Sequence, residues 1–259
     1  MINYLISKDT SLDLSTLKDE VSFEIASGEH YLYLFNIKKD SVFSFELKNE
    51  AILHLSIFSC DELGKARFLV NVGKNAKIVA YFADFSKVIN RTVVEINLND
   101  DNATCEWHSA SLSSNNDQKG IAVSIYHKHP NTFGRIDNYG VCKDNGQLDF
   151  SGTSHILKGC HHSKSHQNAK IVVFDESCVA LARPVLKIDE NDIEASHAAT
   201  VGKVSDEHIF YLTSRGITTE EAKMLITLGY LKPILKGFDT NVQNEIDQLI
   251  ERRLANVQS

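Results

Sequence analysis

A series of short alternating runs, from about residue 30 to residue 204, limits most strongly what this chain can fold into. Runs such as SVFSFELK and AILHLSIF alternate apolar with polar residues, which is typical of β-strands with one buried face. They recur at roughly 9–18 residue intervals with almost no helical pattern between them. This spacing excludes a sheet of β–α–β units and leaves a sandwich, a barrel or a β-solenoid.

The turns between these runs are rich in Asn, Asp and Gly, as in NDDN, SSNNDQKG and KDNG. Similar corners joining strands of similar length favour the solenoid, in which each coil buries its inward face on the next. No strict repeat motif fixes the length of a coil, so the pattern alone leaves the sandwich and the barrel open.

After residue 205 the pattern becomes helical. Thr218 and Glu221 fit a capping box for a helix that ends near Gly229, and a last helix is expected to begin near Thr240. Its predicted apolar face consists of Val242, Ile246, Leu249, Ile250 and Leu254. Its predicted solvent-exposed face consists of Glu245, Asp247, Glu251, Arg252 and Arg253.

These patterns divide the chain into three parts. Residues 1–29 are expected to form a short N-terminal segment, with a short helix in DLSTLKDE and a first strand. Residues 30–204 form the β core, and residues 205–259 form a small C-terminal helical domain. The predicted fold class is mainly β.

Charge and composition exclude several classes of partner. The 27 basic residues against 34 acidic ones give a net charge of −7, and no dense basic stretch suits nucleic acid or an anionic membrane. No secretion signal and no apolar run of about 18 residues is present, so we expect a soluble, cytoplasmic protein. The five cysteines are widely spaced without a CxxC pair, which predicts buried thiols and no disulfides.

Common catalytic motifs are absent from the sequence, including the Walker A loop, the dinucleotide fingerprint, GxSxG and HExxH. A β-solenoid can carry polysaccharide lyases or hydrolases, which need clustered carboxylates. Asp149, Glu176 and Asp189 lie on separate runs, so a carbohydrate-active enzyme stays an alternative hypothesis.

The densest group of ligand-type residues is GCHHSKSH, which contains Cys160, His161, His162 and His166. Thiolate and imidazole would suit zinc, copper or iron. Four such residues within seven positions, without a distant partner, are also typical of a solvated loop. We therefore treat a metal site here as a second hypothesis.

A more specific pattern lies in residues 184–217, PVLKIDENDIEASHAATVGKVSDEHIFYLTSRGI. Pro-x-Leu-x-Ile, the stretch Ser-His-x-Ala-Thr-Val-Gly around His197, and Phe-Tyr-Leu-x-Ser-Arg-Gly-Ile closely resemble the C-terminal part of the SufB/SufD family of iron–sulfur cluster assembly scaffolds. The following EEAKMLITLGYL is similar to the family's next helix.

The resemblance implies a right-handed parallel β-helix with a small helical domain, and a scaffold rather than an enzyme. It implies pairing with a SufB-type paralogue, or with itself, through the β-helix bodies. His197 would lie at that interface and help to hold a nascent iron–sulfur cluster or iron, bound transiently. A SufC-type ABC ATPase would dock on the helical domain near Phe210, Tyr211, Arg215 and Gly216.

Within the family the chain is more similar to SufD than to SufB. Ser196 and Ala198 flank the histidine where SufB-type proteins carry glutamates, and Ala195 stands where some relatives carry cysteine. We expect a compact form without the N-terminal helical region, and Cys178 matches no family cysteine with certainty. A subunit that pairs without holding a cluster is thus a further alternative.

Overall fold

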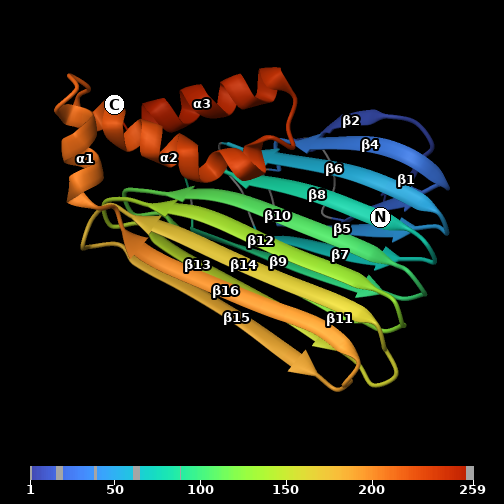
Figure 1. The fold of residues 1–259 in the computed structure, drawn as a ribbon. Helices are drawn as coiled ribbons and strands as arrows, with labels where there is room; N and C mark the ends of the chain where they lie inside the picture. The colour runs from blue at the N-terminus through green and yellow to red at the C-terminus, as the bar shows by residue number, and fades with distance from the viewer. Residues whose placement is uncertain (1, 16–19, 38–39, 61–64, 88, 255–259) are drawn as a thin grey trace.

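The computed structural model of the chain describes residues 2–15, 20–37, 40–60, 65–87 and 89–254. Over these ranges the strands alternate between two parallel sheets, odd-numbered strands in one and even-numbered strands in the other. Because each strand pairs with the strand two positions along the chain, the backbone winds into a flattened β-solenoid (Figure 1). The predicted parallel β-helix with a C-terminal helical domain is confirmed.

The two sheets have the following strands. Sheet A consists of β1 (Ile2–Ile6), β3 (Glu20–Ile25), β5 (Ser41–Leu47), β7 (Ala66–Val72), β9 (Ile89–Leu98), β11 (Gln118–His127), β13 (Gln147–Ile156) and β15 (Val179–Ile188). Sheet B consists of β2 (Thr10–Asp13), β4 (Gly28–Phe35), β6 (Ala51–Ser59), β8 (Lys77–Asp84), β10 (Thr104–Ser113), β12 (Phe133–Cys142), β14 (Ser163–Val173) and β16 (Ile193–Lys203). Strand order in space follows the order in the sequence, so β15 and β16 form one end of the rod.

The β-helix begins at the second residue rather than near residue 30. β1 pairs with β3, and β2 pairs with β4, in the same parallel register as the later strands. The predicted boundary therefore falls inside β4, and residues 2–15 and 20–29 belong to the β-helix. The helix predicted for residues 13–20 lies partly outside the described residues. β2 has only four residues, too few for the alternation to be recognised.

Coil length changes along the rod. Paired residues of sheet B are 25 positions apart in His54↔Val79, 27 apart in Tyr81↔His108 and 31 apart in Asp137↔Asn168. Each coil grows by lengthening strands and corners while the register is kept. A sequence with this gradual drift contains no fixed repeat.

The core is built from equivalent side chains stacked coil on coil. Phe23 stacks on Phe45 with ring centroids 4.9 Å apart, because their strands pair in register and both side chains point inward. At the corners, Asn75, Asn102 and Asn131 adopt left-handed backbone angles, which asparagine tolerates better than most residues. The Asn102 side-chain amide donates to Asn75 Oδ1 at 3.0 Å. The Asn-rich turns are thus the corners of the solenoid.

Three helices, here called the helical handle, follow β16: α1 (Asp206–Thr213), α2 (Thr219–Leu235) and α3 (Thr240–Leu254). The predicted capping box is confirmed, since Thr218 Oγ1 accepts from Glu221 N at 3.2 Å and the Glu221 carboxylate accepts from Thr218 N at 2.8 Å. The predicted end near Gly229 is wrong. α2 continues for another six residues because Leu231, Ile234 and Leu235 are buried.

α2 and α3 lie along the outer face of sheet B (Figure 1). There Phe58, Ala83 and Ala110 form a second apolar core with the handle. On α3, Val242, Ile246 and Ile250 are buried as predicted, Leu249 is half-buried, and the side chain of Leu254 lies outside the described residues. The prediction that Arg253 faces solvent is wrong. No helix within the described ranges is both long and apolar enough to cross a membrane.

Candidate functional site at the open end of the β-helix

His197 lies on β16 at an inward-facing position. It is in register with Gln167 of β14, and the buried Gln167 amide donates to Ser154 Oγ at 2.8 Å and to the Val185 carbonyl at 3.0 Å across the interior. Side chains of residues paired in register project from the same face of a sheet. The His197 imidazole therefore points toward the interior of the rod.

No described strand covers this last coil, so the His197 side chain is exposed although it faces inward. Its inward neighbours on β16 are Ala195 and Ala199. On the opposite strand, β15, the inward positions include Ala182 and Pro184, which are in register with the buried Phe150 and Gly152. The side chains around the His197 imidazole at the open end are thus small.

β15 and β16 are the last strands of their sheets, and each leaves one row of backbone N–H and C=O groups without a strand partner among the described residues. Val201 and Ile188, both at inward positions of this coil, are 45% and 39% exposed. Unpaired strand edges beside exposed apolar side chains are typical of surfaces that add another strand.

A second exposed feature is α1, which follows directly from β16. Phe210 and Tyr211 are 72% and 54% exposed, and no residue of α1 is buried. The Arg215 guanidinium lies over the Tyr211 ring, 4.4 Å from its centroid. Gly216 follows with a φ of +87°, a conformation that glycine adopts without strain. The four residues predicted for partner binding thus form one exposed turn of the handle.

The family model described as "SUF system FeS cluster assembly, SufBD core domain" matches residues 40–230. The chain belongs to the SufB/SufD family. The match includes most of the β-helix, the open end and α1.

Several SufB/SufD proteins are similar in sequence. SufD of Bacillus subtilis is 33% identical over 137 residues, 52% of this chain and 31% of the relative. SufB of the same organism is 27% identical over 194 residues, 64% of this chain and 41% of the relative. A SufBD family protein of Mycobacterium bovis is 29% identical over 154 residues, 60% of this chain and 18% of the relative. The chain spans less than half the length of these relatives.

Cys160, His161 and His162 lie at the corner between β13 and β14 of this SufB/SufD chain, and His166 lies on β14. Cys160 is buried with its thiol donating to the His127 carbonyl at 3.2 Å, and burial raises its pKa. His162 has a left-handed φ of 59° and its ring lies against His161, while His166 is hydrogen-bonded to Ser196. Among the described residues no three His, Cys, Asp or Glu side chains are arranged to hold a metal ion. A metal site at this corner stays a prediction.

The sequence-based interpretation missed a buried charged cluster where β8 ends and β11 begins. The Lys119 ammonium contacts Asp84 Oδ1 at 3.2 Å, with both side chains fully buried, and burial lowers the pKa of Lys119 to about 8. Arg253 of α3 pairs with Asp117 next to it. Asp84 and Lys119 each stand at a position of an alternating run where most of the other residues are apolar and buried. A charged residue at such a position is a signal that could have been read from the sequence.

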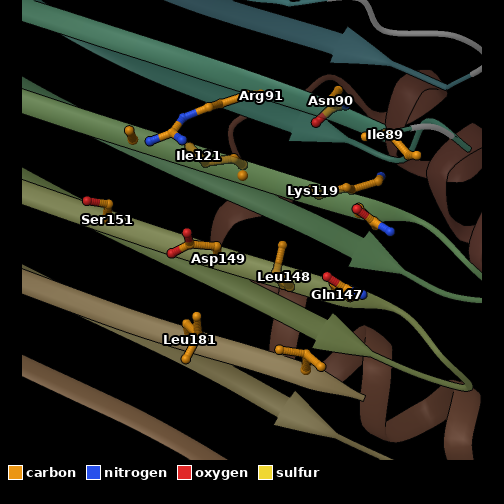
Figure 2. A pocket seen from close by; sticks show the side chains of 14 residues that line it. Ile89, Asn90, Arg91, Lys119, Ile121, Gln147, Leu148, Asp149, Ser151 and Leu181 are labelled. Atoms are coloured by element: carbon orange, nitrogen blue, oxygen red, sulfur yellow. The ribbon is translucent and has the colours of Figure 1, made fainter. Parts of the chain in front are cut away.

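A shallow hollow of about 270 Å³ lies on the outer face of sheet A (Figure 2). Gly120 lies between Arg91 and Asp149 on neighbouring strands, and the hollow is open there because glycine has no side chain. Asp149 is paired with Arg183, whereas Asp189 contacts His155 and Glu176 contacts Lys203. The three carboxylates of the carbohydrate-enzyme hypothesis therefore have separate partners and do not converge on one site.

Proposed function

We propose that this chain is a SufD-like, non-catalytic scaffold subunit of an iron–sulfur cluster assembly complex. The observation that carries the proposal is the position of His197, alone among small side chains at the open end of the rod. The higher identity to a SufD than to a SufB protein supports the choice of subunit type.

The open end suits a second β-helix as its partner. Adding a strand to β15 or β16 would satisfy backbone groups that otherwise face solvent, and would cover Val201 and Ile188. A SufB-type paralogue is the proposed partner, and a second copy of this chain is the alternative. The small residues beside His197 leave room for the partner to approach closely.

The transient cluster, or the iron from which it is built, is the cargo of this interface. A neutral imidazole nitrogen is a good ligand for iron, but one nitrogen cannot hold a cluster. The remaining ligands therefore have to come from the partner, as thiolate or carboxylate. This division would make the assembled pair, rather than either chain, the cluster-binding unit.

The exposed turn of the handle is the proposed dock for an ABC-type ATPase. Phe210 and Tyr211 supply apolar area of the kind that forms the centre of protein interfaces, and Arg215 is held beside them. α1 follows β16 after only two residues. Movement of the docked ATPase would thus be passed directly to the strand that carries His197.

Co-purification tests this proposal. We expect the tagged chain, co-expressed with a SufB-type paralogue and the ABC-type ATPase, to recover both proteins. The double variant Phe210→Ala/Tyr211→Ala should lose the ATPase and keep the paralogue, while Leu225→Ala, an equally apolar exposed change on α2, should keep both. Recovery of neither protein, even after crosslinking, would contradict the scaffold function.

A further inference from the structure

A wide cleft lies where the helical handle meets the outer face of sheet B. Its lining comes from β12, β14 and β16 on one side and from α1 and α2 on the other, and its volume is about 670 Å³. Sites for small molecules are typically clefts of roughly 300–1,000 Å³. The cleft is thus large enough for an organic ligand.

The polar lining of the cleft carries positive charge. Two lysines, Lys170 and Lys203, line it together with His208 and Thr200, and among the described residues no Asp or Glu side chain does, although the chain as a whole is acidic. In the described ranges Lys170 and His208 have no carboxylate partner. Lys203 contacts the exposed Glu176, so among the described lining residues Lys170 is the lysine without a carboxylate partner. Basic side chains without local compensation attract anions.

The remaining walls are aromatic and apolar. Tyr139 lines the cleft from β12, and Tyr230 and Ile226 line it from α2. The Tyr139 hydroxyl accepts from the Asn168 side-chain amide at 3.0 Å, and the Lys170 ammonium lies 5.3 Å from the ring centroid. The ring and the cation are therefore held side by side.

Two glycines keep the cleft open. A Cβ added to Gly229 of α2 or to Gly202 of β16 would meet no atom within 4 Å, so neither glycine is required by packing inside this chain. A glycine inside a helix is less favourable than alanine. At Gly229 the missing side chain leaves space in the cleft instead.

We propose that this cleft binds a small organic anion. Its carboxylate, sulfonate or phosphate group lies beside Lys170, and its aromatic or aliphatic body lies between Tyr139 and α2. This role is independent of the scaffold function, since it uses none of the residues assigned to the open end or to the exposed turn of the handle.

Fluorescence titration of the full chain with two matched probes tests the proposal. Anilinonaphthalene sulfonate carries the anionic group on an aromatic body, and N-phenylnaphthylamine is its uncharged counterpart. We expect saturable binding of the sulfonate about ten-fold tighter than that of the neutral probe, because the sulfonate can contact the Lys170 ammonium and the neutral probe cannot. Lys170→Gln should remove most of this preference.

Two further variants separate the cleft from other surfaces. Gly229→Leu should weaken both probes, because it fills the cleft with a residue that favours helix. Lys74→Gln removes the same charge from an exposed turn outside the cleft and should leave binding unchanged. Sulfonate binding that is equally tight in wild type, Lys170→Gln and Gly229→Leu, or that shows no preference over the neutral probe in wild type, would overturn the proposal.

Discussion

At the scale of single residues, Arg253 connects the end of the handle to the rod. Its guanidinium donates to the Phe85 carbonyl at 2.9 Å, to the Ser86 carbonyl at 3.0 Å and to Ser114 Oγ at 2.8 Å, and it pairs with Asp117. These acceptors belong to two corners of the β-helix. Loss of the guanidinium would leave the Asp117 charge buried without its partner.

We expect Arg253→Met to lower the free energy of unfolding by about 3–5 kcal/mol, as is found when one member of a buried ion pair is removed. The matched change Arg252→Met removes an exposed arginine from the same turn and should cost less than about 0.5 kcal/mol. Urea unfolding measures both. Equal stability of the two variants would show that the buried contacts do not hold the handle.

His127 provides a pH-dependent contribution to stability. Burial lowers its pKa from 6.5 to about 4, so the ring stays neutral in the folded chain. Between these pH values the unfolded chain binds a proton that the folded chain does not, and stability therefore falls as pH falls. The total effect is about 3 kcal/mol.

Unfolding of His127→Leu, followed from pH 7 to pH 4.5, should show a shallower loss of stability than wild type. His129→Leu, two residues away and exposed, should keep the wild-type slope. A wild-type slope in His127→Leu would mean that another group causes the pH dependence.

At the scale of elements, most strands from about residue 40 onward could be predicted because their inward positions are mostly apolar over 7 to 11 residues. β1 and β2 could not, since five and four residues are too few to show the period. The end of α2 was misplaced because Gly229 is a local signal, whereas burial of Leu231 and Ile234 depends on sheet B. Arg253 was misplaced because helical periodicity does not reveal a polar corner beside the helix.

The open end itself was only partly predictable. A family resemblance identified His197, and alternation along β16 is consistent with its inward direction. The group from Cys160 to His166 was a candidate metal site because its residues are close in sequence. Cys160 is buried whereas His161 and His162 are exposed, and metal binding by this group stays a prediction.

Adjacent alanines on β16 test the pairing role of this strand. Ala199 faces inward, in register with Ala169, and Ala198 faces outward, in register with Asn168. We expect Ala199→Arg to abolish association with the SufB-type paralogue, because a partner would seal the charge inside the rod. Ala198→Arg should reduce it little. Size-exclusion chromatography with light scattering measures the complexes, and equal association of both variants would argue against the open end as the interface.

At the scale of the whole molecule, the proposed scaffold function assigns pairing to the rod and ATPase docking to the handle. The rod presents one rigid end with an imidazole, and the handle is fixed to it by the second apolar core and by Arg253. α1, which carries Phe210 and Tyr211, begins after two residues that follow the strand with His197.

Anaerobic cluster reconstitution of the complex with the SufB-type paralogue tests the central claim most directly. Iron and acid-labile sulfide are counted per complex for wild type, for His197→Ala and for His129→Ala as the control. The account predicts that His197→Ala loses most of the iron and sulfide while still forming the complex, and that the control retains both. Equal iron and sulfide in the wild-type and His197→Ala complexes would contradict it.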